Sequence, residues 1–226
     1  YFNEKFEIGH FDNCEYKNYD IESIKEFPKV ITEIKGLRGL NVTIPYKEEI
    51  IPYLDKLSKT AKKIGAVNCV TISKKKKLKG YNTDYHGFKK SIKPLLKDHH
   101  KKALILGTGG ASKAIAYALR SLKIEYDFVS RTADEFQYKY EELDASIFEE
   151  YTIIINTTPV GTHPNVDDCP NLDYSLFTKK HIAYDLIYNP EETAFLRKAK
   201  AQGAVTKNGY EMLVLQAEKA WKIWNE

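Results

Sequence analysis

The sequence predicts an α/β protein whose second half folds into a doubly wound parallel sheet. From residue 101 onward, short apolar runs alternate with helical stretches over about a hundred residues, which is typical of parallel strands joined by helical crossovers. The apolar run 103–107 leads through a glycine-rich turn directly into a helix. In the first half, the runs 68–73 and 78–82 flank four lysines, which indicates an antiparallel hairpin with a solvated tip.

The first half alternates short strands with helices. An amphipathic helix opens the chain, with Phe2 and Phe6 one turn apart. A strand usually precedes such a helix, so we expect the native protein to be longer at this end. Thr43 suits a helix cap and Pro45 the first helical position, which predicts a helix from residue 45 onward. The other expected elements are a strand at 14–20, a helical region at 21–35 broken near residue 28, a buried strand at 37–44, the hairpin, a helix at 84–96 and a linker at 97–102.

The second half supplies the parallel sheet and its helices. Residues 191–203 predict a helix that ends at a glycine stop signal. The last stretch, 209–226, is amphipathic and has no strand of its own, so we expect it to pack on one of two domains. The predicted strands lie at 103–107, 126–130, 152–156, 181–187 and 204–207.

Composition places the chain among globular proteins without a membrane span. Its 226 residues can hold one large domain or two small ones, and 42% are hydrophobic and 29% charged. A net charge of +4 with interspersed signs gives no indication of nucleic acid, and no apolar run approaches the roughly 18 to 20 residues of a membrane span. The three cysteines, at 14, 69 and 169, have no metal-ligand spacing, so we expect a cytoplasmic protein without a metal site.

The strongest local motif is the glycine-rich turn LGTGGAS at 106–112. Glycines allow a sharp turn and a close approach to a pyrophosphate, and the following helix offers unpaired N–H groups. The spacing is GxGGxS rather than GxGxxG, so the motif favours dinucleotide binding over the alternative of a structural tight turn. At the end of the next strand stands Arg131, where NAD-binding folds usually have an acid. An arginine suits a 2′-phosphate and favours NADP, and the alternative is a solvated surface arginine.

Polar residues in the first half fall at the ends of strands or in loops. They are Thr43 with Lys47, then Asn68, then the triplet at 82–84. Lys47 and Asp84 form the one plausible proton-transfer pair among them. A lysine at the positive end of a helix dipole has its charged form disfavoured unless an acid compensates, and Asp84 is a candidate for that acid. On spacing alone, a surface lysine and a helix-capping aspartate are the more common interpretations.

Taken together, these segments resemble the shikimate dehydrogenase family. The resemblance covers nearly the whole chain in family order, and it rests on the segments GLNVTIPYK (39–47), GAVN (65–68), GYNTD (80–84), LGTGGAS (106–112), SRT (130–132), NTTPVGTHP (156–164), YDLIYNP (184–190) and GYEMLVLQA (209–217). It implies reduction of 3-dehydroshikimate to shikimate with NADPH, a step of aromatic amino acid biosynthesis. It also implies a substrate-binding domain (1–98 plus 209–226), a Rossmann-like NADP domain (99–208) and a C-terminal helix that returns to the first domain.

The resemblance assigns roles to individual residues. Lys47 and Asp84 match the catalytic pair, in which the lysine exchanges a proton with the substrate oxygen. The substrate-binding positions are Thr43, Asn68, Asp84, Tyr188 and Gln216. The cofactor-binding positions are Gly107, Thr108, Gly109, Gly110, Ala111, Ser112, Ser130, Arg131, Thr132, Asn156, Thr157, Thr158, Leu186, Gly209 and Met212.

The chain departs from the family pattern at three points. The family's Ser-x-Ser substrate motif would precede Tyr1, Tyr85 follows the YNTD segment where glycine is common, and Ser130 replaces an asparagine. Two other functions stay open: a dehydrogenase for quinate or a related cyclohexane acid, and a non-catalytic module that senses a nucleotide or ligand. The expected partner is a small-molecule substrate, with neither nucleic acid nor membrane, and the expected state is a monomer or homodimer.

Overall fold

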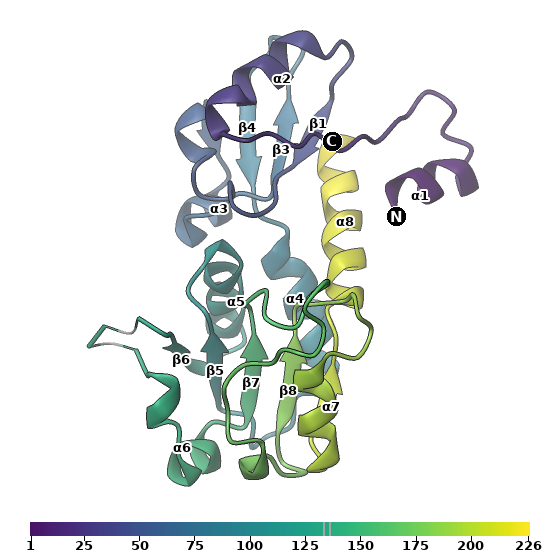
Figure 1. Ribbon diagram of the computed structural model, residues 1–226. Coiled ribbons are helices and arrows are strands. Elements are labelled where there is room, and N and C mark those ends of the chain that lie inside the picture. Colours follow the sequence, from purple (N-terminus) through teal and green to yellow (C-terminus); the bar gives the residue numbers. More distant parts are fainter. Residues whose placement is uncertain (133, 136) are drawn as a thin grey trace.

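Two sheets organise the chain, one in each half (Figure 1). The computed structural model describes residues 1–132, 134–135 and 137–226. The first sheet has four strands in the order β1-β3-β4-β2, and the second has five in the order β6-β5-β7-β8-β9. The predicted α/β class with two domains is therefore confirmed.

The first sheet is built around the predicted hairpin. Strand β3 (Cys69–Ile72) pairs antiparallel with β4 (Leu78–Tyr81) across the lysine turn, and its other edge pairs antiparallel with β1 (Gly39–Asn41). The short strand β2 (Lys56–Leu57) runs parallel to β4. The helices of this half are α2 (Phe27–Glu33), entered through the 3₁₀ turn η1 (Ile24–Glu26), and α3 (Lys59–Ile64). Phe27, Ile50 and Val70 are buried together in its core.

The second sheet is parallel throughout, as predicted. Its strands are β5 (Lys102–Leu106), β6 (Glu125–Val129), β7 (Ile153–Asn156), β8 (Ile182–Asp185) and β9 (Val205–Lys207). Alternate residues of β5 face opposite cores: Ile105 packs with α5 (Gly110–Ser121), and Leu104 packs with α6 (Ala145–Glu150) and α7 (Ala194–Ala201). Helices therefore cover both faces, which makes the sheet doubly wound.

Two helices join the two halves (Figure 1). Helix α4 (Asp84–Ile92), followed by the 3₁₀ turn η3 (Lys93–Leu95), buries Phe88 and Ile92 against the second sheet. Helix α8 (Tyr210–Trp224) starts beside the second sheet and ends at the first, where Trp224 Nε1 donates to the carbonyl of Val70 at 3.1 Å. The predicted return of the C-terminal helix is confirmed. Helix α1 (Phe2–Ile8) packs its two phenylalanines on α8, and the domain boundaries at 98/99 and 208/209 stay predictions.

Two elements that were predicted from the sequence are absent from the structure. Residues 14–20 form no strand, and apart from Tyr16 their side chains are exposed, so no packing partner stabilises an extended pairing there. No α-helix follows Pro45: residues 44–50 form consecutive turns that end in the 3₁₀ turn η2 (Ile51–Tyr53). Pro52 lacks the N–H that a continuing helix would use.

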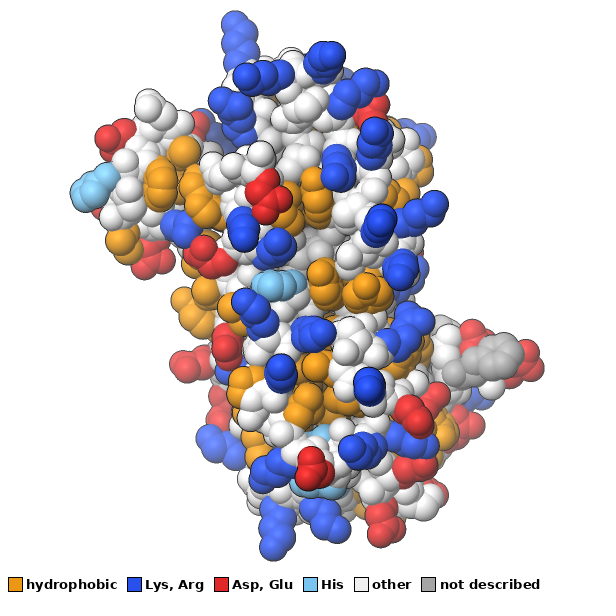
Figure 2. Space-filling view, turned by 180° about the vertical axis from the view of Figure 1, so that it is seen from behind, with side chains coloured by type: hydrophobic (Ala, Val, Ile, Leu, Met, Phe, Trp, Pro, Cys, Tyr) orange, Lys and Arg blue, Asp and Glu red, His pale blue; other side chains and the backbone are white. Residues whose placement is uncertain are grey.

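The surface carries both signs of charge. Lysine and arginine side chains are spread over the back face of both halves, with acidic and apolar side chains between them (Figure 2). None of the described helices has the length and apolar content that a membrane crossing requires.

Candidate active site

Lys47 and Asp84 form a largely buried ion pair. Lys47 Nζ lies 2.8 Å from Asp84 Oδ2, and the two side chains are 14% and 8% exposed. Lys47 stands in the turn segment after β1, where its carbonyl accepts a hydrogen bond from Val67 N at 2.7 Å. Asp84 is the first residue of α4. The expected pairing is present, but the reason drawn from a helix dipole is wrong, because no helix begins before Lys47.

Asn68, Thr83 and Gln216 extend this pair into a network. Asn68 Nδ2 donates to Asp84 Oδ1 at 2.8 Å, and its Oδ1 accepts from Thr83 N at 2.6 Å. Gln216 Oε1, from helix α8, accepts from Asn68 Nδ2 at 3.2 Å and from Thr83 Oγ1 at 3.1 Å. Residues from the loop before β3, the start of α4 and the C-terminal helix therefore meet in one cluster of polar atoms.

Gln216 reaches this network because α4 and α8 cross closely at Gly87. A Cβ atom on Gly87 would lie 2.5 Å from the carbonyl oxygen of Met212 and 3.1 Å from Gln216 Cβ. Such distances leave no room for a larger residue. Gly87 thus brings the backbone of α8 within reach of Thr83 and Asn68.

The other expected substrate residues do not join the network. Thr43 is exposed on the turn segment, and Tyr188, beyond β8, is 48% exposed. No recorded hydrogen bond between described side chains connects either residue to Asp84. Asn82, the first residue of the predicted triplet, has a structural role: its side chain donates to the carbonyl of Ala66 at 3.1 Å and accepts from Tyr85 N at 3.3 Å.

The glycine-rich turn lies beside Lys47. Gly107 has φ +96°, and a Cβ atom there would lie 2.9 Å from Thr158 Cγ2. Gly109 caps α5, with open space where its Cβ would be. A Cβ on Gly110 would lie 3.2 Å from Lys47 Cβ. The turn from the second sheet therefore contacts the segment that carries the lysine.

The rest of this loop fits an anion site. Thr108 is exposed, Ala111 is half-buried, and the buried Ser112 donates from Oγ to the carbonyl of Gly109 at 2.6 Å. The first N–H groups of an α-helix have no partner within the helix, so α5 presents donors at this turn. The described residues hold no group of three or more side chains that could bind a metal ion.

Further contacts between the halves surround the glycine turn. Lys113 of α5 forms an ion pair with Glu48, the neighbour of Lys47. Tyr85 meets Tyr117 of α5 edge to face, with ring centroids 5.3 Å apart. Both tyrosines pack against the buried Ile64, Ala66 and Ala114. Tyr85, a departure from the family pattern, thus packs between the halves. Neither Lys113 nor Tyr117 was predicted from the sequence.

Ser130, Arg131 and Thr132 follow β6 at the same end of the sheet as the glycine turn. Ser130 N donates to the carbonyl of Tyr138 at 2.9 Å, and Ser130 Oγ accepts from Thr132 N at 3.3 Å. The Arg131 side chain is exposed. Burial raises the pKa of the neighbouring Tyr140 phenol, and the Arg131 charge opposes that rise. An exposed guanidinium at a strand end suits a phosphate ligand.

The ends of β7 and β8 hold a buried polar group that the sequence predicts only in part. Asn156 Nδ2 donates to Asp185 Oδ1 at 3.1 Å, and both side chains are fully buried. Burial raises the pKa of Asp185 to about 6, opposed by its hydrogen bonds. Gly209 packs on the backbone of Leu186, and Leu186 packs with the buried Met212. A charged residue at the end of an apolar strand was the available signal for Asp185.

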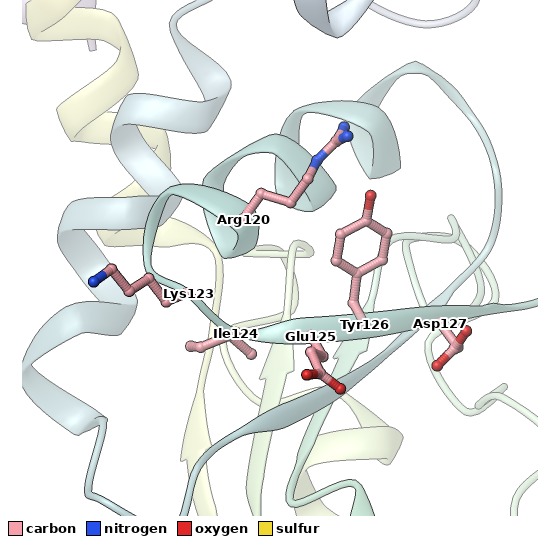
Figure 3. A pocket seen from close by; sticks show the side chains of 6 residues that line it. All are labelled: Arg120, Lys123, Ile124, Glu125, Tyr126 and Asp127. Atoms are coloured by element: carbon pink, nitrogen blue, oxygen red, sulfur yellow. The ribbon is translucent and has the colours of Figure 1, made fainter.

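A hollow elsewhere on the surface is not part of this site. It lies between the C-terminal end of α5 and the start of β6, and Figure 3 shows the residues that line it: Arg120, Lys123, Ile124, Glu125, Tyr126 and Asp127. Arg120 stands ten residues after Gly110, which at about 1.5 Å per residue puts it some 15 Å along the helix. The hollow is therefore at the opposite end of α5 from the glycine turn.

Comparison with known proteins decides the family. Residues 1–70 match the model of the shikimate dehydrogenase substrate binding domain. A protein of Caldanaerobacter subterraneus subsp. tengcongensis, named shikimate dehydrogenase (NADP(+)), is 42% identical over 207 residues, which are 84% of this chain and 72% of that protein. This chain belongs to the shikimate dehydrogenase family.

Solved structures of shikimate dehydrogenases agree with the fold described above. That of shikimate dehydrogenase 1 from Peptoclostridium difficile has 40% identity and a TM-score of 0.81, over 99% of this chain and 84% of that one. The enzyme of Thermus thermophilus, solved in complex with NADP(H) and shikimate, has 34% identity and a TM-score of 0.77, over 89% and 78% of the two chains. The predicted family is confirmed.

Proposed function

We propose that the chain is an NADP-dependent dehydrogenase that interconverts 3-dehydroshikimate and shikimate. The observation that carries the proposal is the position of the largely buried Lys47–Asp84 pair beside Gly110 of the glycine turn. A proton-transfer pair and a dinucleotide-binding turn are the two parts that a carbonyl reduction needs in one place. The names of the relatives support the substrate and the cofactor.

In this proposal, Lys47 Nζ gives a proton to the ketone oxygen of the substrate as the carbonyl becomes a hydroxyl, and takes it back in the reverse direction. Asp84 holds the ammonium group at 2.8 Å and orients it. When bound, the nicotinamide supplies the hydride. Positioned proton transfer contributes about 10²- to 10⁴-fold to the rate.

The polar network around the pair is the proposed substrate site. Asn68 and Gln216 present amide groups next to Asp84, which suits a ring that carries several hydroxyls. Thr43 and Tyr188 are proposed on the family resemblance alone, because among the described residues neither side chain is hydrogen-bonded to the network.

The cofactor assignment rests on the turn after β5 and on the end of β6. Open space next to Gly109 and the unpaired donors at the start of α5 fit a pyrophosphate. The exposed Arg131, with Ser130 and Thr132, fits the 2′-phosphate that distinguishes NADP from NAD. A cytoplasmic location and a monomer or homodimer stay predictions.

Absorbance at the NADPH band tests the proposal. Purified protein with shikimate and NADP should produce NADPH, and kcat/KM should be lower with quinate and with NAD. A higher kcat/KM for quinate would favour the alternative dehydrogenase. Tight NADP binding without turnover on any cyclohexane acid would favour the sensing module.

A further inference from the structure

We propose that Asp185 is a positioning residue for the cofactor site, and that it acts through Asn156 on the loop that contacts Gly107. The inference rests on the proposed function, since it assumes that the glycine turn holds NADP. It adds a role for two buried residues at the ends of β7 and β8.

The Asp185 carboxylate is fully buried and accepts hydrogen bonds from three groups. Asn156 Nδ2 at 3.1 Å and Ile187 N at 3.0 Å bond to Oδ1, and Thr193 Oγ1 at 2.6 Å bonds to Oδ2. Among the described residues, no Lys or Arg forms an ion pair with Asp185. An ionised carboxylate in such a place is costly unless it is fully hydrogen-bonded, so its position is closely defined by these donors.

The carboxylate sets the orientation of the Asn156 side chain. Asn156 and Asp185 are register partners, as the last residues of adjacent strands. Because a carboxylate oxygen can only accept, the NH₂ group of Asn156 must face it and the amide oxygen must face away. That oxygen accepts from Thr158 N at 3.0 Å and from Thr158 Oγ1 at 2.6 Å. The Asn156 side chain is thus engaged within the protein.

Thr158 connects the Asn156 side chain to the glycine turn. Its Cγ2 methyl lies 2.9 Å from the point that a Cβ atom on Gly107 would occupy. The adjacent Thr157 donates from Oγ1 to the carbonyl of Leu106 at 2.7 Å, which attaches the same loop to β5. The loop after β7 therefore forms a wall of the turn that we assign to the pyrophosphate.

Asp185 holds a second segment on the other side. Its bond to Ile187 N fixes the chain just after β8, and the carbonyl of Ile187 accepts from Gly209 N at 3.0 Å. Leu186 and Gly209, two proposed cofactor residues, lie on this segment. One buried carboxylate thus joins both loops that follow β7 and β8 at the carboxyl edge of the sheet, where doubly wound folds bind their ligands.

The test compares Asp185→Ala with Asp185→Asn. In Asp185→Ala the Asn156 NH₂ group keeps only the carbonyl of Val160, at 3.4 Å, as its acceptor, so the side chain is held less firmly. We expect KM for NADP to rise about tenfold, with KM for shikimate changed less than about twofold. In Asp185→Asn one amide oxygen can still accept from Asn156 and Ile187 while its NH₂ faces Thr193, so KM for NADP should return to within about threefold of the wild type.

Asp144→Ala is the matched control. It removes the carboxylate that caps α6 and that has no hydrogen bond to Asp185, so we expect lower thermal stability with KM for NADP unchanged. If Asp185→Ala does not fold, Thr158→Val carries the test. It deletes the hydroxyl that donates to Asn156 Oδ1 and that accepts from Val160 N at 3.3 Å, and its KM for NADP should rise about threefold.

Two results would overturn the inference. One is a wild-type KM for NADP in a folded Asp185→Ala protein. Where that variant does not fold, a wild-type KM for NADP in Thr158→Val has the same meaning. The other is a rise in KM for NADP in Asp144→Ala equal to that in Asp185→Ala, which would show a general loss of stability. A calorimetric titration of the wild type with NADPH distinguishes a failure of this inference from a failure of the proposed function. If the wild type does not bind NADPH, the proposed function itself is contradicted.

Discussion

Replacing Gly87 by alanine should separate the C-terminal helix from the substrate network. The new methyl carbon would stand 2.5 Å from the carbonyl oxygen of Met212, whereas C–H···O contacts settle at about 3.3 to 3.6 Å. The two helices must therefore move apart by about 1 Å. Gln216 accepts its two hydrogen bonds at 3.2 and 3.1 Å, so this movement takes both beyond hydrogen-bonding distance.

The size of the effect follows from these two bonds. At about 1 kcal/mol each, their loss corresponds to a rise of about 10- to 30-fold in KM for shikimate. Crowding costs about 1 to 3 kcal/mol of unfolding free energy, and the better helix propensity of alanine returns about 1 kcal/mol. Lys90→Ala, at an exposed position of the same helix, is the control. Steady-state kinetics of Gly87→Ala with wild-type KM for shikimate would refute this account of Gln216.

Three further predictions concern charged groups. The Glu48–Lys113 pair is 42% and 40% exposed, so a double-mutant cycle with Glu48→Gln and Lys113→Met should give a coupling below about 1 kcal/mol that disappears in 1 M salt; a larger, salt-independent value would contradict a screened contact. Arg131→Ala should raise KM for NADP about 10- to 100-fold and leave KM for NAD unchanged, whereas equal changes would remove the 2′-phosphate role. Because burial raises the pKa of Asp185 to about 6 in the folded state, that state holds the proton to higher pH than the unfolded chain does, and the free energy of unfolding should fall by about 2 kcal/mol between pH 4 and pH 7 relative to Asp185→Asn. Urea titrations at pH 4 and pH 7 measure these free energies of unfolding, and the same change with pH in both proteins would contradict the prediction. The Tyr174 phenol, which the Asp185 charge reaches, stays protonated because burial raises its pKa.

The parallel sheet could be predicted because its signals are local. Each buried strand is a short apolar run, and the glycine turn directly joins a strand to a helix. The strand at 14–20 was wrong because a strand also needs a neighbouring strand and a packed face, which a short stretch of sequence does not show. The helix after Pro45 was wrong because good capping residues do not show how the chain continues past Pro52.

The site residues could be predicted where they lie in segments that resemble the family. Asn68 and Gln216 are 148 positions apart, and no periodicity in the chain brings them together. The close crossing at Gly87 decides that contact, and it is a tertiary property. Asp185 was missed as a functional residue because its bonds to Asn156 and Thr193 follow from strand register and from a cap, neither of which the local sequence reveals.

Lys47 as the proton donor is the central claim about this site. The decisive measurement is kcat for NADP reduction by shikimate in Lys47→Met, beside Lys77→Met as the matched control. Lys77 also pairs with an aspartate, at 2.7 Å, but its side chain is 72% exposed and far from the glycine turn in the chain. We predict a fall in kcat of about 10²- to 10⁴-fold for Lys47→Met with unchanged NADPH affinity, and wild-type kcat for Lys77→Met. Wild-type kcat in Lys47→Met would contradict the central claim.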